Sequence, residues 1–151
     1  MKLAVTRVTS AEEKATAMAL RLQVFVNEQG FVPSDEFDEV DDKDTTVHFL
    51  GKDVEQDKYV AVARAALDLS ARKAKLSRVA VLSECRGKNF GAALMQSVEQ
   101  SIVDQVDLYV IEALYDKKVF YEKCGYRCIN DEIYLQEGVE HCMMTKKAVK
   151  L

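Results

Sequence analysis

The sequence contains few of the residues that are typical of flexible linkers. Its 151 residues include one proline, six glycines and no tryptophan. So little proline and glycine leaves little room for a disordered linker, and no internal repeat or low-complexity tract is present. No apolar run approaches the roughly 20 residues that a membrane-spanning helix requires. We therefore expect one domain over residues 1–151, long enough for a two-layer core.

The sequence also lacks an excess of positive charge. Its 21 lysines and arginines are outnumbered by 25 aspartates and glutamates, which gives a formal net charge of −4 and a pI near 5.3. A nucleic-acid-binding protein needs a basic face, so we expect no nucleic-acid partner, and no membrane partner either. The N-terminus, MKLAVTRVTSAEEKA, has acidic residues before any sustained apolar stretch, unlike a secretory signal. We expect a cytoplasmic or similarly reducing location.

Four cysteines are present, and in a reducing compartment we expect free thiols rather than disulfides. Cys124, Cys128, His141 and Cys142 are residue types that bind zinc, but their spacing contains no CxxC pair. On a strand, His141 and Cys142 would point to opposite faces and could not share one metal ion. The acidic run 35–44 has no DxDxDG register that closes with a glutamate, as a calcium loop would need. We expect no metal.

Hydrophobic periodicity predicts a mixed α+β fold. The predicted order is β-α-(α)-β-β-β-α-β-α-β-β, and the strand–helix–strand unit at 74–113 must pair in parallel. One helical face in that unit is formed by apolar residues that recur every four positions: Phe90, Leu94, Val98 and Ile102. A second, short helix, VFYEKC, should end at Gly125. Between Val26 and Thr45 the pattern is irregular and acidic.

The segment RGKNFG, at 86–91, lies between the strand and the helix of that unit. One interpretation is a polar turn whose charges are simply solvated. A nucleotide-triphosphate loop does not fit because Asn89 follows Lys88, and the dinucleotide fingerprint GxGxxG is absent. The other interpretation is a diphosphate site, since first-turn N–H groups and the helix dipole attract anions while Gly87 and Gly91 permit close approach. Coenzyme A carries such a diphosphate.

This loop resembles Q/R-x-x-G-x-G/A, the acetyl-CoA signature of the GCN5-related N-acetyltransferases (GNATs). A second segment of that family, FYxxxGF, is similar to FYEKCGY at 120–126. The narrower resemblance to the small bacterial ElaA/YjcF-like branch spans nearly the whole chain and rests on LRLQVFVNEQGFVPSDEFDEVDD, His48, SRVAV and EGVEHCMM. Asn89 departs from the loop's first glycine but tolerates left-handed backbone. Leu114 and Lys117 depart from an asparagine and an alanine that the wider family often has.

The resemblance implies a GNAT fold, with a central, mixed, mostly antiparallel twisted sheet of about six to seven strands and about four flanking helices. The strands at 76–82 and 107–113 would form a splayed parallel pair. It implies an acetyl-CoA-dependent N-acetyltransferase, with acetyl-CoA as co-substrate and direct attack by a primary amine. The acceptor would be a small-molecule or lysine-like amine, and homodimers are common in the family. Two alternatives stay open: a glucosamine-phosphate-type N-acetyltransferase, whose sugar phosphate the acidic run would repel, and a non-catalytic acyl-CoA-binding sensor.

The resemblance also suggests the catalytic residues. Tyr121 is predicted to be the general acid, because a phenol that titrates near ~10 can share its proton with a thiolate that titrates near ~8.5. It lies about 100° around the helix from Phe120 and Cys124, which can face the core; the alternative is a tyrosine that only packs on the sheet edge. Glu112, near the end of a central strand, is predicted to be the general base.

The remaining candidate residues would bind the two substrates. The predicted cofactor-binding residues are Val79, Ala80, Val81, Arg86, Gly87, Lys88, Asn89, Phe90, Gly91, Ala92 and Tyr121. The predicted substrate-binding residues are Glu28, Glu36, Asp38 and His48. Glu28 and His48 are also the other candidate bases. Glu36 and Asp38 belong to the acidic run, which is either a solvated loop or a group of charges that attracts a cationic amine.

Overall fold

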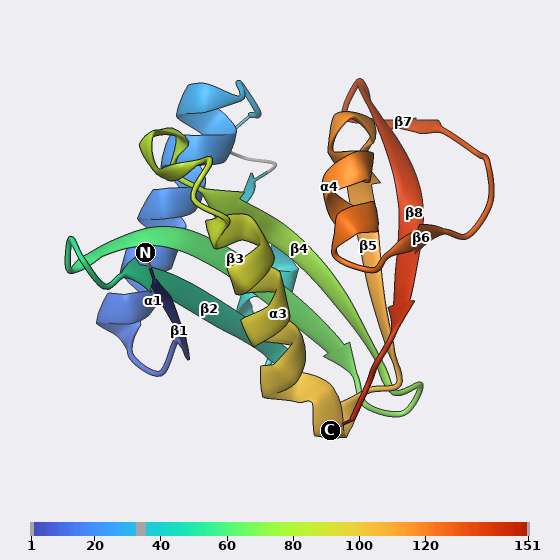
Figure 1. Cartoon of the computed structure of the whole chain (residues 1–151), viewed down its shortest axis with the longest axis horizontal. Helices are drawn as coiled ribbons and strands as arrows, with labels where there is room; N and C mark the ends of the chain where they lie inside the picture. Colours follow the sequence, from blue (N-terminus) through green and yellow to red (C-terminus); the bar gives the residue numbers. More distant parts are fainter. Residues whose placement is uncertain (1, 33–35, 151) are drawn as a thin grey trace.

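Residues 2–32 and 36–150 are described by the computed structural model, and a mixed β-sheet runs through them (Figure 1). Its strands are β1 (Leu3–Arg7), β2 (Thr46–Asp53), β3 (Lys58–Asp68), β4 (Lys73–Val81), β5 (Leu108–Leu114), β6 (Arg127–Cys128), β7 (Tyr134–Gln136) and β8 (Val139–Lys147). The order of this 8-stranded sheet is β1-β2-β3-β4-β5-β8-β6, with β7 paired to β8. Each pair is antiparallel except β4 and β5, which confirms the predicted fold class. The strand beyond the predicted count is β6, whose 2 residues are too few to show a hydrophobic period.

Three α-helices and several shorter helical turns surround the described part of the sheet. They are α1 (Ala11–Arg21), α3 (Phe90–Ile102) and α4 (Lys118–Lys123), the π-helix η1 (Leu22–Glu28), and the 3-10 helices η2 (Glu39–Asp42), η3 (Ser83–Cys85), η4 (Val103–Gln105) and η5 (Tyr115–Lys117). The π-helix η1 continues α1, and η2 gives order to part of the acidic run. Among the described helices, none is both long and apolar enough to cross a membrane.

The core forms where α1 and α3 pack on β3. This strand is buried at every position from Val60 to Ala65, so the side chains on both of its faces are covered. The predicted apolar face of α3 is confirmed, since each of its residues is at most 3% exposed: Phe90, Leu94, Val98 and Ile102. Each such side chain contributes roughly 1.5–3 kcal/mol by leaving water. This burial holds the first turn of α3 firmly beside the end of β4.

The parallel strands β4 and β5 are paired over only part of their length. Their register runs from Lys73 opposite Leu108 to Leu76 opposite Ile111, although β4 continues to Val81. Figure 1 shows the two strands diverging beyond this point. A bulge in β4 accompanies the divergence, because the register with β3 shifts and Arg78 has φ of 54°. The predicted splayed pair is therefore confirmed.

The short helix α4 lies over the diverging end of β5. As predicted, a glycine follows its last turn, and Gly125 has φ of +98°. The predicted orientation of the helix is only partly right: Phe120 and Cys124 contact the core, but Tyr121 is the most buried of the three, at 9% exposed. The partly buried Phe120 ring packs against Gly91 at the start of α3.

Candidate active site

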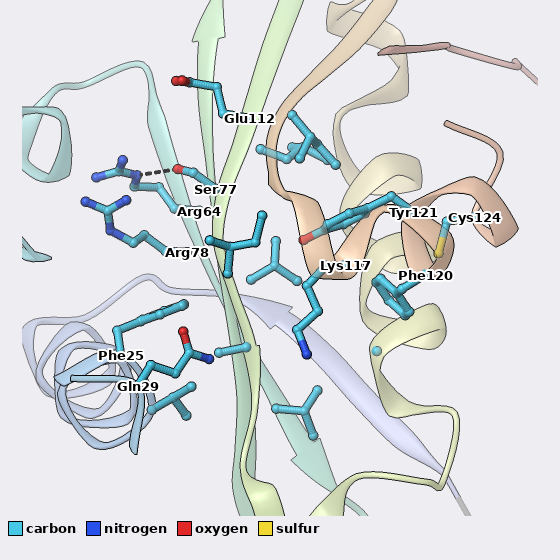
Figure 2. Close-up of a pocket in the computed structure, with 18 of the residues that line it drawn as sticks. Phe25, Gln29, Arg64, Ser77, Arg78, Glu112, Lys117, Phe120, Tyr121 and Cys124 are labelled. Atoms are coloured by element: carbon cyan, nitrogen blue, oxygen red, sulfur yellow. Dashed lines mark hydrogen bonds between the residues drawn. The ribbon is translucent and has the colours of Figure 1, made fainter. Parts of the chain in front are cut away.

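A cleft of about 890 Å³ opens where β4 and β5 diverge, and it is also lined by the start of α3, by α4 and by the acidic segment. All the predicted site residues line this cleft except Glu28, Lys88 and His48. Figure 2 shows the Tyr121 hydroxyl directed into the split between the strands. It shows the side chains of Arg64 and Arg78 on the other side of β4. The cleft therefore joins the candidate diphosphate-binding loop at 86–91 to the acidic run.

The loop before α3 has an open backbone. Gly87 has φ of +83°, and a Cβ built on it would meet nothing within 4 Å. Asn89 adopts the left-handed conformation expected of it, with φ of 61°, and its side chain does not cap α3. The first N–H groups of an α-helix have no intrahelical partner, and the first residues of α3, Phe90, Gly91 and Ala92, line the cleft. Such a cradle fits an anionic group, and the positive φ at position 87 favours glycine there.

The other glycine of the loop has a different role. A Cβ on Gly91 would lie 3.0 Å from Cζ of Phe120. That distance is shorter than carbon atoms in contact normally keep. Gly91 thus permits the close approach of α3 and α4, which brings Tyr121 towards the loop.

Arg86 and Glu28 form an ion pair across the mouth of the cleft. The guanidinium contacts both carboxylate oxygens, with 3.0 Å between Nη2 and Oε2, and its Nε donates to the carbonyl of Val81 at 3.1 Å. Arg86, predicted to bind the cofactor, and Glu28, predicted to bind the substrate, thus neutralise each other's charge. Lys88 lies outside the cleft lining, with its amine 5.9 Å from the centre of the Phe90 ring.

Tyr121 has a buried ring and a hydroxyl that makes no hydrogen bond within residues 2–32 and 36–150. Its ring packs edge-on against Phe120 and Tyr126, with centroids 5.1 and 6.0 Å away. Burial raises the pKa of the Tyr121 phenol well above its usual range, because the phenolate would lose its hydration. The hydroxyl is therefore a protonated, unengaged donor that faces the cleft.

A buried polar cluster behind α4 keeps this tyrosine in place. Lys146 of β8 donates to the carbonyl of Cys124 at 2.8 Å and contacts Glu99 of α3 at 2.7 Å. The Tyr126 hydroxyl donates to the same carboxylate at 2.8 Å. These contacts tie the last turn of α4 to α3 and β8, and nothing in the sequence pattern indicates them.

Glu112 projects from β5 and is held from two sides. Its carboxylate forms an ion pair with Lys75 of β4 and accepts a hydrogen bond from the Tyr134 hydroxyl at 2.8 Å. Burial alone would raise the pKa of Glu112, but the bonds from Lys75 and Tyr134 outweigh it and hold the pKa below its usual range. Glu112 is therefore ionised at neutral pH and fixed in orientation.

Three acids of the run 35–44, namely Glu36, Asp38 and Asp41, are paired with arginines. Arg21, which is 0% exposed, contacts Glu36 Oε1 from Nε at 2.9 Å and Asp41 Oδ1 from Nη1 at 2.6 Å. Arg64 contacts Asp38 at 2.7 Å and Asp41 at 3.0 Å. Burial would raise the pKa of Asp41, but the Arg21 guanidinium prevails and lowers it to about 2. The solvated-loop interpretation is therefore wrong for the buried acids Glu36 and Asp41, whereas Asp38 is paired with Arg64 but exposed.

The same arrangement bears on the acids predicted to bind substrate. Glu36 also contacts Arg78, at 3.1 Å, and Arg78 and Asp38 lie 3.4 Å apart. Three guanidiniums thus surround three carboxylates, so Glu36 and Asp38 offer no uncompensated negative charge to a cation. Their contact with the acceptor stays a prediction, although both line the cleft.

His48 lies behind this network and not in the cleft. Its Nε2 is 3.0 Å from the carbonyl oxygen of Asp41, and within the described residues its buried Nδ1 has no hydrogen-bond partner. Burial lowers the pKa of the imidazole, so the ring is neutral at pH 7. This geometry suits a residue that fixes η2 on β2.

Several cleft residues were missed by the sequence analysis. Arg64 carried a signal, because a charged residue inside the apolar strand YVAVARAALDL has to be paired if it is buried. Phe25 of η1 and Lys75 had none, since an aromatic residue on a helix and a lysine on a strand are ordinary. Tyr134 does not line the cleft itself, and it reaches Glu112 only through the pairing of β7 with β8.

The cysteines form no disulfide. All four are free thiols, and Cys128 and Cys142 approach within 3.9 Å between their sulfur atoms. Within the part of the chain that the structure describes, no group of three or more histidine, cysteine, aspartate or glutamate side chains is placed to hold a metal ion.

Comparison with known families identifies the class of protein. The family described as "Acetyltransferase (GNAT) domain" matches residues 11–148. A Bacillus subtilis (strain 168) protein named "Putative acetyltransferase BSU40680" is 32% identical over 145 residues, which is 95% of each chain. YjcF of the same organism, named an uncharacterized N-acetyltransferase, is 27% identical over 136 residues, covering 89% of this chain and 93% of its own. The chain therefore belongs to the GNAT family and is an acyltransferase.

Solved structures share the fold. A crystal structure of a "putative N-acetyltransferase" from Lactobacillus plantarum superposes with a TM-score of 0.87 at 25% identity, covering 99% of this chain and 100% of that one. Escherichia coli ElaA has a TM-score of 0.83 at 24% identity, over 96% of this chain and 99% of its own. The predicted resemblance to the GNAT family is confirmed, and ElaA and YjcF are among the proteins that this chain is similar to.

Proposed function

We propose that residues 1–151 form one acetyl-CoA-dependent N-acetyltransferase domain in which a primary amine attacks the acetyl group directly. The observation that carries this proposal is the single cleft that joins the open start of α3 to the unengaged hydroxyl of Tyr121. An aminoglycoside 6'-N-acetyltransferase that was solved with coenzyme A has the same fold, with a TM-score of 0.72 at 16% identity over 100% of this chain and 99% of its own. That structure supports coenzyme A as the ligand of the cleft.

The loop and the free edge of β4 would hold the co-substrate. Main-chain N–H groups at 86–92 would bind its diphosphate at the start of α3. The unpaired edge of β4 around Val79 to Val81 would accept the pantetheine arm as an added strand, because β5 has already diverged there. When bound, acetyl-CoA supplies a thioester whose carbonyl carbon is open to attack by an amine. An N–H group of this edge would polarise that carbonyl.

Tyr121 would protonate the departing thiolate. Its hydroxyl faces the cleft and has no competing acceptor among the described residues. Its raised pKa keeps the proton on the phenol throughout the neutral range. The hydroxyl lowers the energy of the thiolate as it forms by sharing a hydrogen bond with it. A proton that passes to sulfur leaves a phenolate, and the proton that the attacking amine loses balances it, so the reaction consumes no net proton.

Glu112 would take the proton that the attacking amine must lose. The carboxylate is ionised, lines the cleft and is oriented by Lys75 and Tyr134. Its lowered pKa makes it a weaker base than a carboxylate in an apolar pocket, so we expect a contribution at the low end of the range for proton transfer, about 10²-fold.

The acceptor is proposed to be a small-molecule or lysine-like amine. A phosphorylated amino sugar is the second candidate, because one observation removes the argument against it. The acidic run was expected to repel phosphate, but Glu36 and Asp38, its acids that line the cleft, are paired with arginines, and two of these arginines, Arg64 and Arg78, line the same cleft.

Two measurements test the function. Coenzyme A should raise the melting temperature of the purified protein, since a ligand at a hundredfold excess over its Kd stabilises the folded state by about 2.7 kcal/mol. Acetyl-CoA should then release free thiol when offered with amines from a panel of polyamines, amino acids, peptides, amino sugars and their phosphates. No thermal shift with coenzyme A at any concentration would contradict the proposal. A shift without thiol release from any amine would instead favour an acyl-CoA-binding role.

A further inference from the structure

We propose that Lys117 is a second anchor for the coenzyme's diphosphate, placed across the cleft from the loop at 86–92. This inference rests on the proposed function, because it assumes that coenzyme A occupies the cleft. It concerns a residue that departs from the small side chain often found at this position in the family.

The cations of the loop are poorly available to an anion. Arg86 is held by both carboxylate oxygens of Glu28 and by the carbonyl of Val81. Lys88 does not line the cleft. An anion at the start of α3 would therefore meet main-chain N–H groups and the helix dipole, but little net positive charge from the loop's own side chains.

Lys117 supplies that charge from the opposite wall. It is the last residue of η5, is exposed, and lines the same cleft as Gly87 and Asn89. Within residues 2–32 and 36–150 its amine has no hydrogen bond or ion pair. Figure 2 shows this amine pointing away from the Tyr121 hydroxyl, into the space between β4 and the start of α3.

Two positive groups, the start of α3 and the Lys117 amine, thus line the same cleft. The start of α3 carries the positive end of the helix dipole, and a lysine opposite it is repelled. An anion bound between the two turns this repulsion into attraction on both sides. A diphosphate fits this arrangement, since it carries negative charge on two linked groups and can contact the N–H groups and the amine together. The geometry therefore favours Lys117 as a binding residue. Because its amine points away from the Tyr121 hydroxyl, we assign it no part in proton transfer.

The test compares Lys117→Met with Lys118→Met by calorimetric titration with coenzyme A. Both variants remove one lysine charge and keep most of the side chain's length. Lys118 is the matched control, because it follows Lys117 directly, does not line the cleft and lies with its amine 5.8 Å from the centre of the Tyr115 ring. We expect Lys117→Met to raise the Kd for coenzyme A about 10-fold and Lys118→Met to leave it unchanged. Lys117→Met should also show a weaker salt dependence of binding.

Two further ligands identify the group that Lys117 contacts. Dephospho-coenzyme A keeps the diphosphate and lacks the 3'-phosphate, so the two lysine variants should differ as they do with coenzyme A. Pantetheine lacks both groups, so its weaker binding, measured by competition, should not distinguish the variants. A Lys117 effect that disappears with dephospho-coenzyme A would assign the lysine to the 3'-phosphate and overturn the proposal. Equal Kd values for wild type and Lys117→Met would overturn it while leaving the proposed function intact. A wild-type protein that does not bind coenzyme A would overturn both.

Discussion

Replacing Tyr121 with phenylalanine should reduce turnover while leaving the fold unchanged. The Tyr121 hydroxyl has no hydrogen-bond partner in the described residues, so its removal leaves no protein group unsatisfied. The edge-on contacts of its ring with Phe120 and Tyr126 remain available to phenylalanine. We therefore expect a melting temperature and a Kd for coenzyme A equal to those of the wild type.

The loss should appear in kcat. If Tyr121 protonates the departing thiolate, its removal should lower kcat by about 10²–10³-fold, or about 2.7–4 kcal/mol of transition-state stabilisation. The assay is thiol release from acetyl-CoA at saturating concentrations of both substrates, with an amine acceptor found in the screen. A Tyr121→Phe enzyme with kcat within about 3-fold of wild type would refute the assignment, because general acids contribute far more than that.

Tyr126→Phe is the matched control for this variant. It removes a hydroxyl from a neighbouring buried ring, but that hydroxyl donates to the buried carboxylate of Glu99 at 2.8 Å. Its loss should cost about 1.5–3 kcal/mol of stability and lower the melting temperature by about 2–4 °C per kcal/mol. Tyr126 does not line the cleft, and Lys146 still holds the last turn of α4 through the Cys124 carbonyl, so kcat of this variant should stay near that of the wild type. Tyr121→Phe should thus lose turnover and keep its stability, whereas Tyr126→Phe should lose stability and keep its turnover.

Three other outcomes follow from the site. Arg21→Met should lower the free energy of unfolding by about 3–5 kcal/mol in urea titrations, since it leaves the buried carboxylates of Glu36 and Asp41 without their shared partner. The pKa of Asp41 is lowered from 3.8 to about 2, so its ionisation should contribute about 2 kcal/mol of stability that is fully present above pH ~5 and lost as the pH falls through about 2. Unfolding free energies measured between these limits should show that slope, and Asp41→Asn should lack it. Glu112→Gln should lower kcat/KM about 10²-fold without changing the Kd for coenzyme A, and an unchanged kcat/KM would exclude Glu112 as the base.

Features set by neighbouring residues could be predicted from the sequence. The four-residue spacing from Phe90 to Ile102 marked the buried face of α3, and the strands on either side required a parallel pair. The left-handed turn at Asn89 and the end of α4 at Gly125 follow from the backbone preferences of those two residue types. The family resemblance rested on the same local segments. Each of these signals is contained within a few consecutive residues, which is why it survives without knowledge of the fold.

Charge compensation and burial could not be predicted in this way. The acidic run looked uncompensated because its partners, Arg21 and Arg64, are 20 and 23 residues from Asp41 in the sequence. The sequence around Glu112 does not indicate its partner, because Lys75 lies 37 residues away and contacts it only across the sheet. The fraction of Tyr121 that is buried likewise depends on how closely α3 approaches α4. Periodicity and turn chemistry act along the chain, whereas the electrostatic environment of a side chain depends on which distant residues the fold places within a few ångströms of it.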